Sequence, residues 1–187
     1  MGLDLGLNEA GLRVAVSQDM DKWCIETMRR NSHLAIDGDI RDLIESDPSC
    51  EFFLQASGVT REALFAVVGG PPCQPFSTAG KRKGVEDARG QLYQEFIKVV
   101  SALRPRFFIM ENVKGLASMP CDPADKQSKP VLDTILESFK AIGYHTVHGI
   151  LDAVHYGTPQ FRERLVIAGS RAGEDIFLPA PTPFQRH

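Results

Sequence analysis

Apolar residues along the chain recur at two spacings, one typical of helices and one of strands. The helical spacing, in which apolar residues lie three or four positions apart, predicts helices at residues 3–10, 21–31, 91–103 and 130–142. Short apolar runs predict strands at residues 13–17, 64–68, 106–110, 144–151 and 164–169. Strands that alternate with helices indicate an α/β domain with a largely parallel sheet.

The loops that follow the predicted strands are the expected place for a ligand. In parallel sheets, ligands bind beyond the carboxyl ends of the strands, which here means after Ser17, Val68 and Met110. Residues 71–90 are rich in glycine, proline and charge, and so predict a long loop. A loop of that length inside a compact domain usually has a function.

Composition narrows the class of protein. The 187 residues are 43% hydrophobic and 24% charged, which fits one globular domain. The net charge of −3 argues against a basic surface over the whole chain, although Lys81, Arg82 and Lys83 form a local basic cluster. Taken alone, that cluster is best explained as a solvated loop. We see no apolar run of membrane-spanning length and no signal peptide, so a cytoplasmic protein is expected.

The four cysteines form no C-x-x-C motif, and a reduced cytoplasm does not favour disulfides. We expect Cys24 and Cys50 to be buried, as free cysteines often are. His145 and His148 lack a plausible third ligand nearby, so no metal site is predicted.

Cys73 is a candidate nucleophile, although for a lone cysteine burial is the commoner explanation. It follows a predicted buried strand in the run GGPPCQPFS at residues 69–77. Glycines allow the backbone to approach a ligand closely, and prolines stiffen the turn. The loop would hold the thiol at the carboxyl end of a strand.

Two further groups could share the crevice with Cys73. Glu111 comes directly after the predicted strand at 106–110, where a carboxyl could hold or donate a proton; a capping or salt-bridging role is the alternative. Arg162 and Arg164 alternate in the run QFRER, which would put both on one side of an extended segment. Paired guanidinium groups suit phosphate or a carboxylate, while a polar strand edge is the alternative.

Three segments of the chain resemble, in their order, three conserved motifs of the cytosine-C5 DNA methyltransferases. They are GGPPCQPFS at 69–77, ENV at 111–113 and QFRER at 160–164. Residues 80–93 resemble the mobile catalytic loop of that family and the helix after it. The resemblance extends from Gly2 to about Thr182. It implies a Rossmann-like methyltransferase fold that uses S-adenosylmethionine, with a mostly parallel sheet and helices on both faces.

The resemblance also implies a mechanism. A cytosine in duplex DNA must be flipped into the active-site pocket before it can react. Cys73 would then attack carbon-6, and Glu111 would bind the ring nitrogen at position 3 and the exocyclic amine. Carbon-5 would take the methyl group. Arg164 resembles the arginine that contacts the base, and Arg162 would orient Glu111 or bind a phosphate.

Further residues are implied to contact the substrates. The positions that match DNA contacts, including backbone phosphate contacts, are Gln74, Ser77, Lys81, Arg82 and Arg89. On the adenosine side of S-adenosylmethionine, Asp19 would bind the ribose hydroxyls, Met20 would pack on adenine, and Asp39 in the Gly38–Ile40 segment would accept from the adenine amine. Positions that match the methionine side are Gly70, Pro72 and Leu92.

The chain departs from the family pattern at both ends. Residues 1–7 match only the tail of the family's first motif, so the first strand of the sheet is expected to be lacking. After residue 169 the family continues into a target-recognition domain, which is expected to be absent. Residues 1–187 are therefore expected to be a partial methyltransferase catalytic domain. Its expected partners are double-stranded DNA at the nucleoid and a complementing chain.

Two alternatives remain open from the sequence. One group of similar enzymes methylates cytosine-5 in transfer RNA with the same motifs. A second alternative is an inactive remnant or a subunit that depends on a partner. The intact Cys73, Glu111 and Arg164 argue against long decay of an active site.

Overall fold

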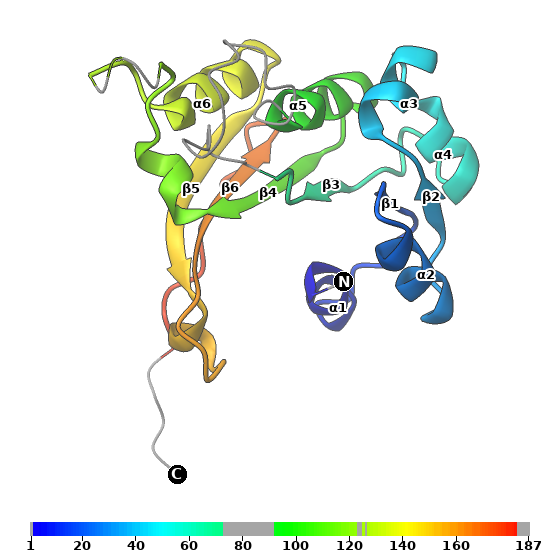
Figure 1. Ribbon diagram of the computed structural model, residues 1–187, viewed down its shortest axis with the longest axis horizontal. Coiled ribbons are helices and arrows are strands. Elements are labelled where there is room, and N and C mark those ends of the chain that lie inside the picture. Colours follow the sequence, from blue (N-terminus) through cyan, green and yellow to red (C-terminus); the bar gives the residue numbers. More distant parts are fainter. Residues whose placement is uncertain (1, 73–91, 123–124, 126, 183–187) are drawn as a thin grey trace, which may run out of the picture. The chain divides into compact units, whose positions relative to one another are not determined.

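Figure 1 shows the computed structural model of the chain, which describes residues 2–72, 92–122, 125 and 127–182. The chain divides into two compact units, Met1–Leu64 and Phe65–His187. Over the described residues, no helix is long and apolar enough to cross a membrane.

The first unit contains a small parallel sheet and four helices. Its elements are α1 (Gly2–Glu9), β1 (Ser17–Asp19), α2 (Lys22–Arg30), β2 (Ala35–Asp37), α3 (Ile40–Ser46) and α4 (Glu51–Ser57). Strand β1 pairs with β2 in parallel, with Ser17 opposite Ala35 and Asp19 opposite Asp37. The strand predicted at 13–17 therefore lies later in the chain, where β2 provides a partner. Sequence analysis did not predict β2, α3 or α4.

Helix α2 begins at an N-cap residue that is visible in the sequence. The Asp21 side chain caps its first turn by accepting hydrogen bonds from the backbone N–H groups of Trp23 at 2.8 Å and Cys24 at 3.0 Å. These bonds, that of Cys24 first, lower the pKa of Asp21. Only Ile25 and Met28 of this helix are buried. The predicted burial of Cys24 is wrong, because Cys24 lies on the exposed face; Cys50 is buried as predicted.

The second unit is built on a four-stranded sheet. Its elements are β3 (Ala66–Gly69), α5 (Leu92–Leu103), β4 (Phe107–Val113), η1 (Lys114–Ser118), α6 (Val131–Ala141), β5 (His145–Asp152), η2 (Ala153–Tyr156) and β6 (Glu163–Ser170). The strand order is β3-β4-β6-β5. Strand β3 is parallel to β4, whereas β6 is antiparallel to both β4 and β5.

The α/β class predicted from the sequence is confirmed, and the sheet is mixed. Strands β3, β4 and β5 run in one direction and β6 alone runs in the other. The reversal follows from the connection between β5 and β6. Residues 153–162 contain only the short helix η2, which cannot span the crossover that a parallel neighbour needs.

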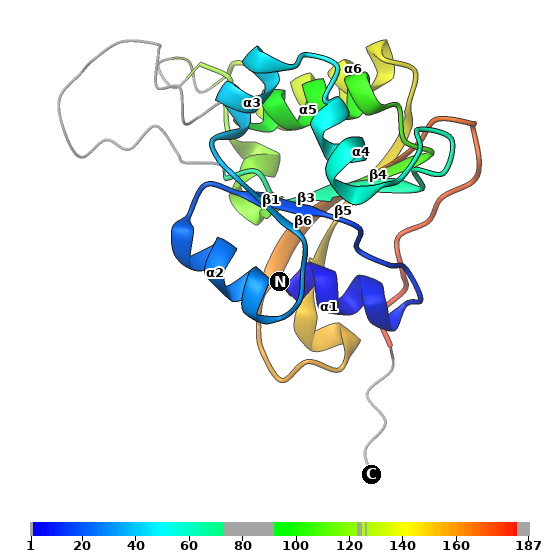
Figure 2. The same cartoon turned by 90° about the vertical axis from the view of Figure 1, so that its right-hand side faces the viewer.

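The core of this unit lies between the sheet and helices α5 and α6. In β4, Phe108 and Met110 are fully buried, and Phe108 stacks on Phe139 of α6 with ring centroids 3.9 Å apart. The alternation of strand side chains puts Glu111 on the opposite face from Phe108. Both α-helices cover one face of this sheet (Figure 2). The other face is the one that carries Glu111.

After β6 the chain runs back along the sheet. Glu174 forms an ion pair with Arg106, just before β4 begins. Further along, the Tyr156 hydroxyl donates to the Pro179 carbonyl at 2.9 Å, and the Thr182 N–H donates to the His155 carbonyl at 2.8 Å. This segment, residues 171–182, is called the return segment below.

Gly169 in β6 provides a test of the core. A Cβ atom there would lie 2.0 Å from Cε1 of the buried Phe108 ring. We expect Gly169→Ala to lower the free energy of unfolding by about 2–3 kcal/mol, because a ring inside a packed aromatic stack has little room to move. Urea denaturation measures the loss. Gly115→Ala is the matched control, since no atom lies within 4 Å of its Cβ position. Equal unfolding free energies for the two variants would contradict the packing described here.

Candidate active site

The candidate site lies where β3 ends beside β4. Strand β3 ends at Gly69 opposite Met110, whereas β4 continues to Val113, so Glu111 lies within β4 and not after its end as the sequence predicted. Because β6 is antiparallel to β4, it starts here, with Arg164 opposite Val113. The topology therefore brings together three segments that lie far apart in the sequence.

Glu111 and Arg164 form an ion pair across β4 and β6. The Nε of Arg164 lies 2.7 Å from Oε1 of Glu111, and both side chains are about three-quarters buried, with exposed fractions of 26% and 28%. A partly buried charge pair is held in one geometry more firmly than a surface pair. Arg164 therefore orients the Glu111 carboxylate, a role that the sequence analysis offered to Arg162.

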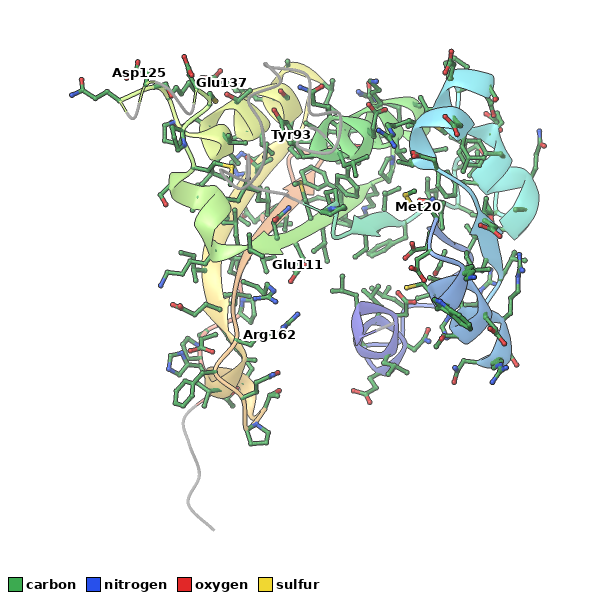
Figure 3. All side chains as sticks on the ribbon, in the orientation of Figure 1. Met20, Tyr93, Glu111, Asp125, Glu137 and Arg162 are labelled. Carbon is green, nitrogen blue, oxygen red and sulfur yellow. The ribbon has the colours of Figure 1, made fainter. Side chains whose placement is uncertain are left out.

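Arg162 lies further along the β5–β6 connection, on an exposed part of the chain (Figure 3). Its backbone N–H donates to Oδ1 of Asp152 at 2.8 Å, and its carbonyl accepts from the Ala153 N–H at 3.2 Å. These bonds close the connection before β6 starts. The exposed guanidinium leaves phosphate binding as the role still predicted for Arg162.

Gly70 lies against the Glu111 carboxylate. A Cβ atom at Gly70 would come within 3.1 Å of Oε2 of Glu111, closer than most real contacts of such atoms. The absence of a side chain at this position therefore leaves space for the carboxylate. Gly70 is the residue that joins β3 to the segment containing Cys73.

Several predicted residues lie outside the described part of the chain, namely Cys73, Gln74, Ser77, Lys81, Arg82 and Arg89. The described chain stops at Pro72, which is exposed, and resumes at Leu92, the first residue of α5. Pro72 and Leu92, with Gly70, are the positions predicted to line the methionine side of the cofactor.

In the first unit, the predicted adenosine-side residues lie at the carboxyl ends of two neighbouring strands. Asp19 ends β1, and Asp39 follows β2 and caps α3. The two ends are tied together, since the Gly38 N–H donates to the Asp19 carbonyl at 3.2 Å and the Gln18 amide donates to the Gly38 carbonyl at 2.6 Å. Met20 extends its side chain into solvent, with an exposed fraction of 61%.

The carboxylate of Asp39 is engaged by Arg41. Its Oδ1 accepts from the backbone N–H of Arg41 at 2.9 Å and from Nε at 3.0 Å, and Nη2 of Arg41 contacts Oδ2. These hydrogen bonds, the side-chain bond first, lower the pKa of Asp39 below its ordinary value of 3.8. The Asp39 carboxylate, which is predicted to accept a hydrogen bond from the adenine amine, is thus held in place by Arg41.

Replacing Arg41 with glutamine is expected to raise the pKa of Asp39 toward 3.8. A lowered pKa in the folded state stabilises the fold above the unfolded value, and the gain is lost as the pH falls through the folded value. The stability difference between wild type and Arg41→Gln should therefore be constant above about pH 5 and shrink below pH 4. Carboxyl NMR titration measures the pKa. Arg30→Gln, which removes an exposed pair with Glu26, is the control and should leave Asp39 unchanged.

Other sites contribute little chemistry. Over the described residues, no group of three His, Cys, Asp or Glu side chains could hold a metal ion. Cys50 is buried, and burial raises the pKa of its thiol to about 11, which leaves it protonated at neutral pH.

Similar proteins identify the family of this chain. A family model described as C-5 cytosine-specific DNA methylase matches residues 1–186. The chain belongs to this family. Curated relatives include the Type II methyltransferase M.AquIA of Picosynechococcus, which is 38% identical over 97% of this chain and 72% of its own length. The Type II methyltransferase M.NgoFVII of Neisseria gonorrhoeae is 35% identical over 97% of this chain and 44% of its own length.

A solved structure also shares the methylase fold. The Dnmt2 methyltransferase of S. pombe superposes with a TM-score of 0.68 at 22% identity, over 94% of this chain and 49% of that one. At this identity the likeness concerns the fold alone. The chain spans about half the length of that protein and of M.NgoFVII.

Two features of the candidate site were not predicted from the sequence. The first is an ion pair between Lys114 and Glu163, 2.7 Å apart, which joins the end of β4 to the start of β6. Opposite charges were visible in the sequence, but not the strand register that pairs them. The second is Asn112, which is 5% exposed. The sequence feature that could have revealed Asn112 is a polar residue at an inward-facing position of a predicted buried strand.

Proposed function

We propose that this chain is the catalytic part of a DNA (cytosine-5-)-methyltransferase that forms a covalent adduct between Cys73 and a flipped cytosine. One observation carries the proposal. In a chain of this family, Glu111, Arg164 and the backbone that leads to Cys73 converge at one edge of the sheet. A nucleophile, a carboxylate and an orienting cation are the groups that addition to a pyrimidine ring requires.

The residues divide the chemistry among them. The Cys73 thiolate forms a bond to carbon-6, and electron density moves into the ring toward carbon-5 and nitrogen-3. Glu111 donates a proton to nitrogen-3 and accepts a hydrogen bond from the exocyclic amine, and so offsets the negative charge that develops on the ring. Arg164 keeps the carboxylate in place through its 2.7 Å ion pair and contacts the base. After carbon-5 has taken the methyl group, water accepts the carbon-5 proton; the electrons of that bond form the double bond between carbon-5 and carbon-6, and Cys73 leaves as the thiolate.

The methyl donor in this proposal is S-adenosylmethionine, whose sulfonium supplies an electrophilic methyl group. The first unit fits its adenosine part chemically. Asp19 and Asp39 offer two carboxylates at neighbouring strand ends, which suit ribose hydroxyls and an amine, and the exposed thioether of Met20 suits the face of adenine. In the second unit, Gly70, Pro72 and Leu92 would line the methionine part.

The proposed substrate is double-stranded DNA. Arg162, Gln74, Ser77, Lys81, Arg82 and Arg89 would contact it, mainly at phosphates. The curated relatives are named Type II methyltransferases, so we infer a role in restriction–modification. Such a protein would work at the nucleoid in the cytoplasm, where its DNA lies.

A complementing chain is also part of the proposal. If a second chain is needed, the purified protein should bind S-adenosylmethionine in calorimetry and yet form product only when extract of the source cells is added. Full activity of the purified chain would refute this part of the proposal.

The activity is tested by incubating the chain with unmethylated genomic DNA and S-adenosylmethionine that carries a labelled methyl group. Digestion and mass spectrometry should find the label in 5-methylcytosine. Transfer RNA is the parallel substrate, and label found in its cytosines instead of in DNA would favour the RNA alternative. If neither nucleic acid gains label and calorimetry detects no cofactor binding, with or without extract, the proposed activity is refuted.

A further inference from the structure

Asn112 is a buried polar residue placed between two parts of the candidate site. It lies in β4 directly after Glu111, with an exposed fraction of 5%, and alternation turns its side chain to the opposite face. Its Nδ2 donates to the Pro71 carbonyl at 2.9 Å, and its Oδ1 accepts from the Val113 N–H at 2.8 Å. Both ends of the amide are therefore used.

The bond to Pro71 occurs where the main chain can no longer pair. The ladder between β3 and β4 ends with Gly69 opposite Met110. Two residues later the chain reaches Pro71 and Pro72, which have no N–H group to donate to a neighbouring strand. Beyond the last backbone pair, the hydrogen bond from the Asn112 side chain to the Pro71 carbonyl therefore holds the segment after β3 against β4.

We propose that Asn112 is a positioning residue for the reaction, which couples the segment leading to Cys73 to the strand that carries Glu111. This inference rests on the proposed function. The nucleophile and the carboxylate must reach opposite sides of the same ring system, and small errors in such geometry cost large factors in rate. Asn112 touches no reacting atom in this proposal; it acts through the Pro71 carbonyl, two residues before Cys73.

The sharpest variant is Asn112→Asp, which keeps the shape and the acceptor for the Val113 N–H but removes the donor to Pro71. Asn112→Ala removes both and serves if the aspartate variant does not fold. We expect either variant to lower kcat by about tenfold to a hundredfold, while the KM for DNA and the affinity for S-adenosylmethionine stay within about twofold. Ser170→Ala is the control, since Ser170 is the other buried polar residue that the structure describes and it lies at the far end of β6.

Partial unfolding would lower the apparent kcat only in proportion to the folded protein that is lost, and circular dichroism measures the folded fraction. A loss of kcat that remains when kcat is expressed per folded molecule therefore separates positioning from a merely structural role. A kcat for both variants within twofold of that of Ser170→Ala would overturn the proposal. So would a raised KM with an unchanged kcat.

A second measurement needs no catalysis. The rate at which iodoacetamide alkylates Cys73, relative to the exposed Cys24, should differ between wild type and Asn112→Ala by roughly threefold or more, because the backbone beside Cys73 loses its tether. An unchanged ratio would overturn the positioning role. A wild-type chain that methylates nothing would instead refute the proposed function, so the two failures are distinguishable.

Discussion

Replacing Glu111 with glutamine is expected to slow formation of the covalent adduct with 5-fluorocytosine DNA by about a hundredfold to a thousandfold. The carboxyl group is proposed to offset charge on the ring by giving a proton to nitrogen-3, and an amide of the same shape can donate a hydrogen bond there but cannot transfer the proton. The substitution also removes the charge partner of Arg164, which lies 2.7 Å from Oε1. Gel shifts of denatured protein–DNA adducts measure the rate.

Glu174→Gln provides the matched control for this experiment. Glu174 is a similarly exposed glutamate, with a side-chain exposed fraction of 31%, and it forms an ion pair with Arg106 at the opposite end of β4. Its loss should change adduct formation by no more than about threefold, as expected for a surface pair. If Glu111→Gln and Glu174→Gln react at the same rate, Glu111 is not the group that stabilises the adduct.

Replacing Cys73 with alanine is expected to abolish the adduct altogether. A covalent bond to carbon-6 needs a thiolate, and no other group in the proposed site can replace it. The measurement is the same trapping assay, followed by mass spectrometry of the modified peptide. DNA binding by the variant, measured by fluorescence anisotropy, should persist, because alanine removes only the reacting atom.

Cys24→Ala is the control for thiol chemistry elsewhere in the chain. Cys24 is exposed, but the negative charge of Asp19 raises the pKa of its thiol, which reduces its thiolate fraction. We expect this variant to form the adduct at the wild-type rate. An adduct that persists in Cys73→Ala would refute the assignment of the nucleophile.

The candidate site could be predicted where it depends on a buried strand. The run at 106–110 predicted a buried strand, and that strand, β4, is present and extends to Val113, so that Glu111 lies within it beside Gly70. Such a run is a strong signal because a buried strand needs apolar residues along its length. The order of the motifs likewise identified the family that the comparisons confirm.

What could not be predicted depends on contacts that are distant in the sequence. Strand β2 and helices α3 and α4 are short, with three to seven residues each, and too brief for a periodic pattern to show. The choice of Arg164 over Arg162 as partner of Glu111 follows from the register of β6 against β4. The burial of Cys24 was predicted from how often free cysteines are buried, and it is wrong because only two of the nine positions of its helix are buried.

The reversed direction of β6 has a practical consequence. Strand β6 ends at Ser170, opposite Phe107 and away from Glu111, but the return segment brings the chain back to His155 beside the hairpin that starts β6. A fluorophore attached at Thr182 would therefore be anchored on the connection that leads into β6 and Arg164. Such a label would make the protein a reporter, in which a change of emission signals the arrival of DNA without any need for turnover.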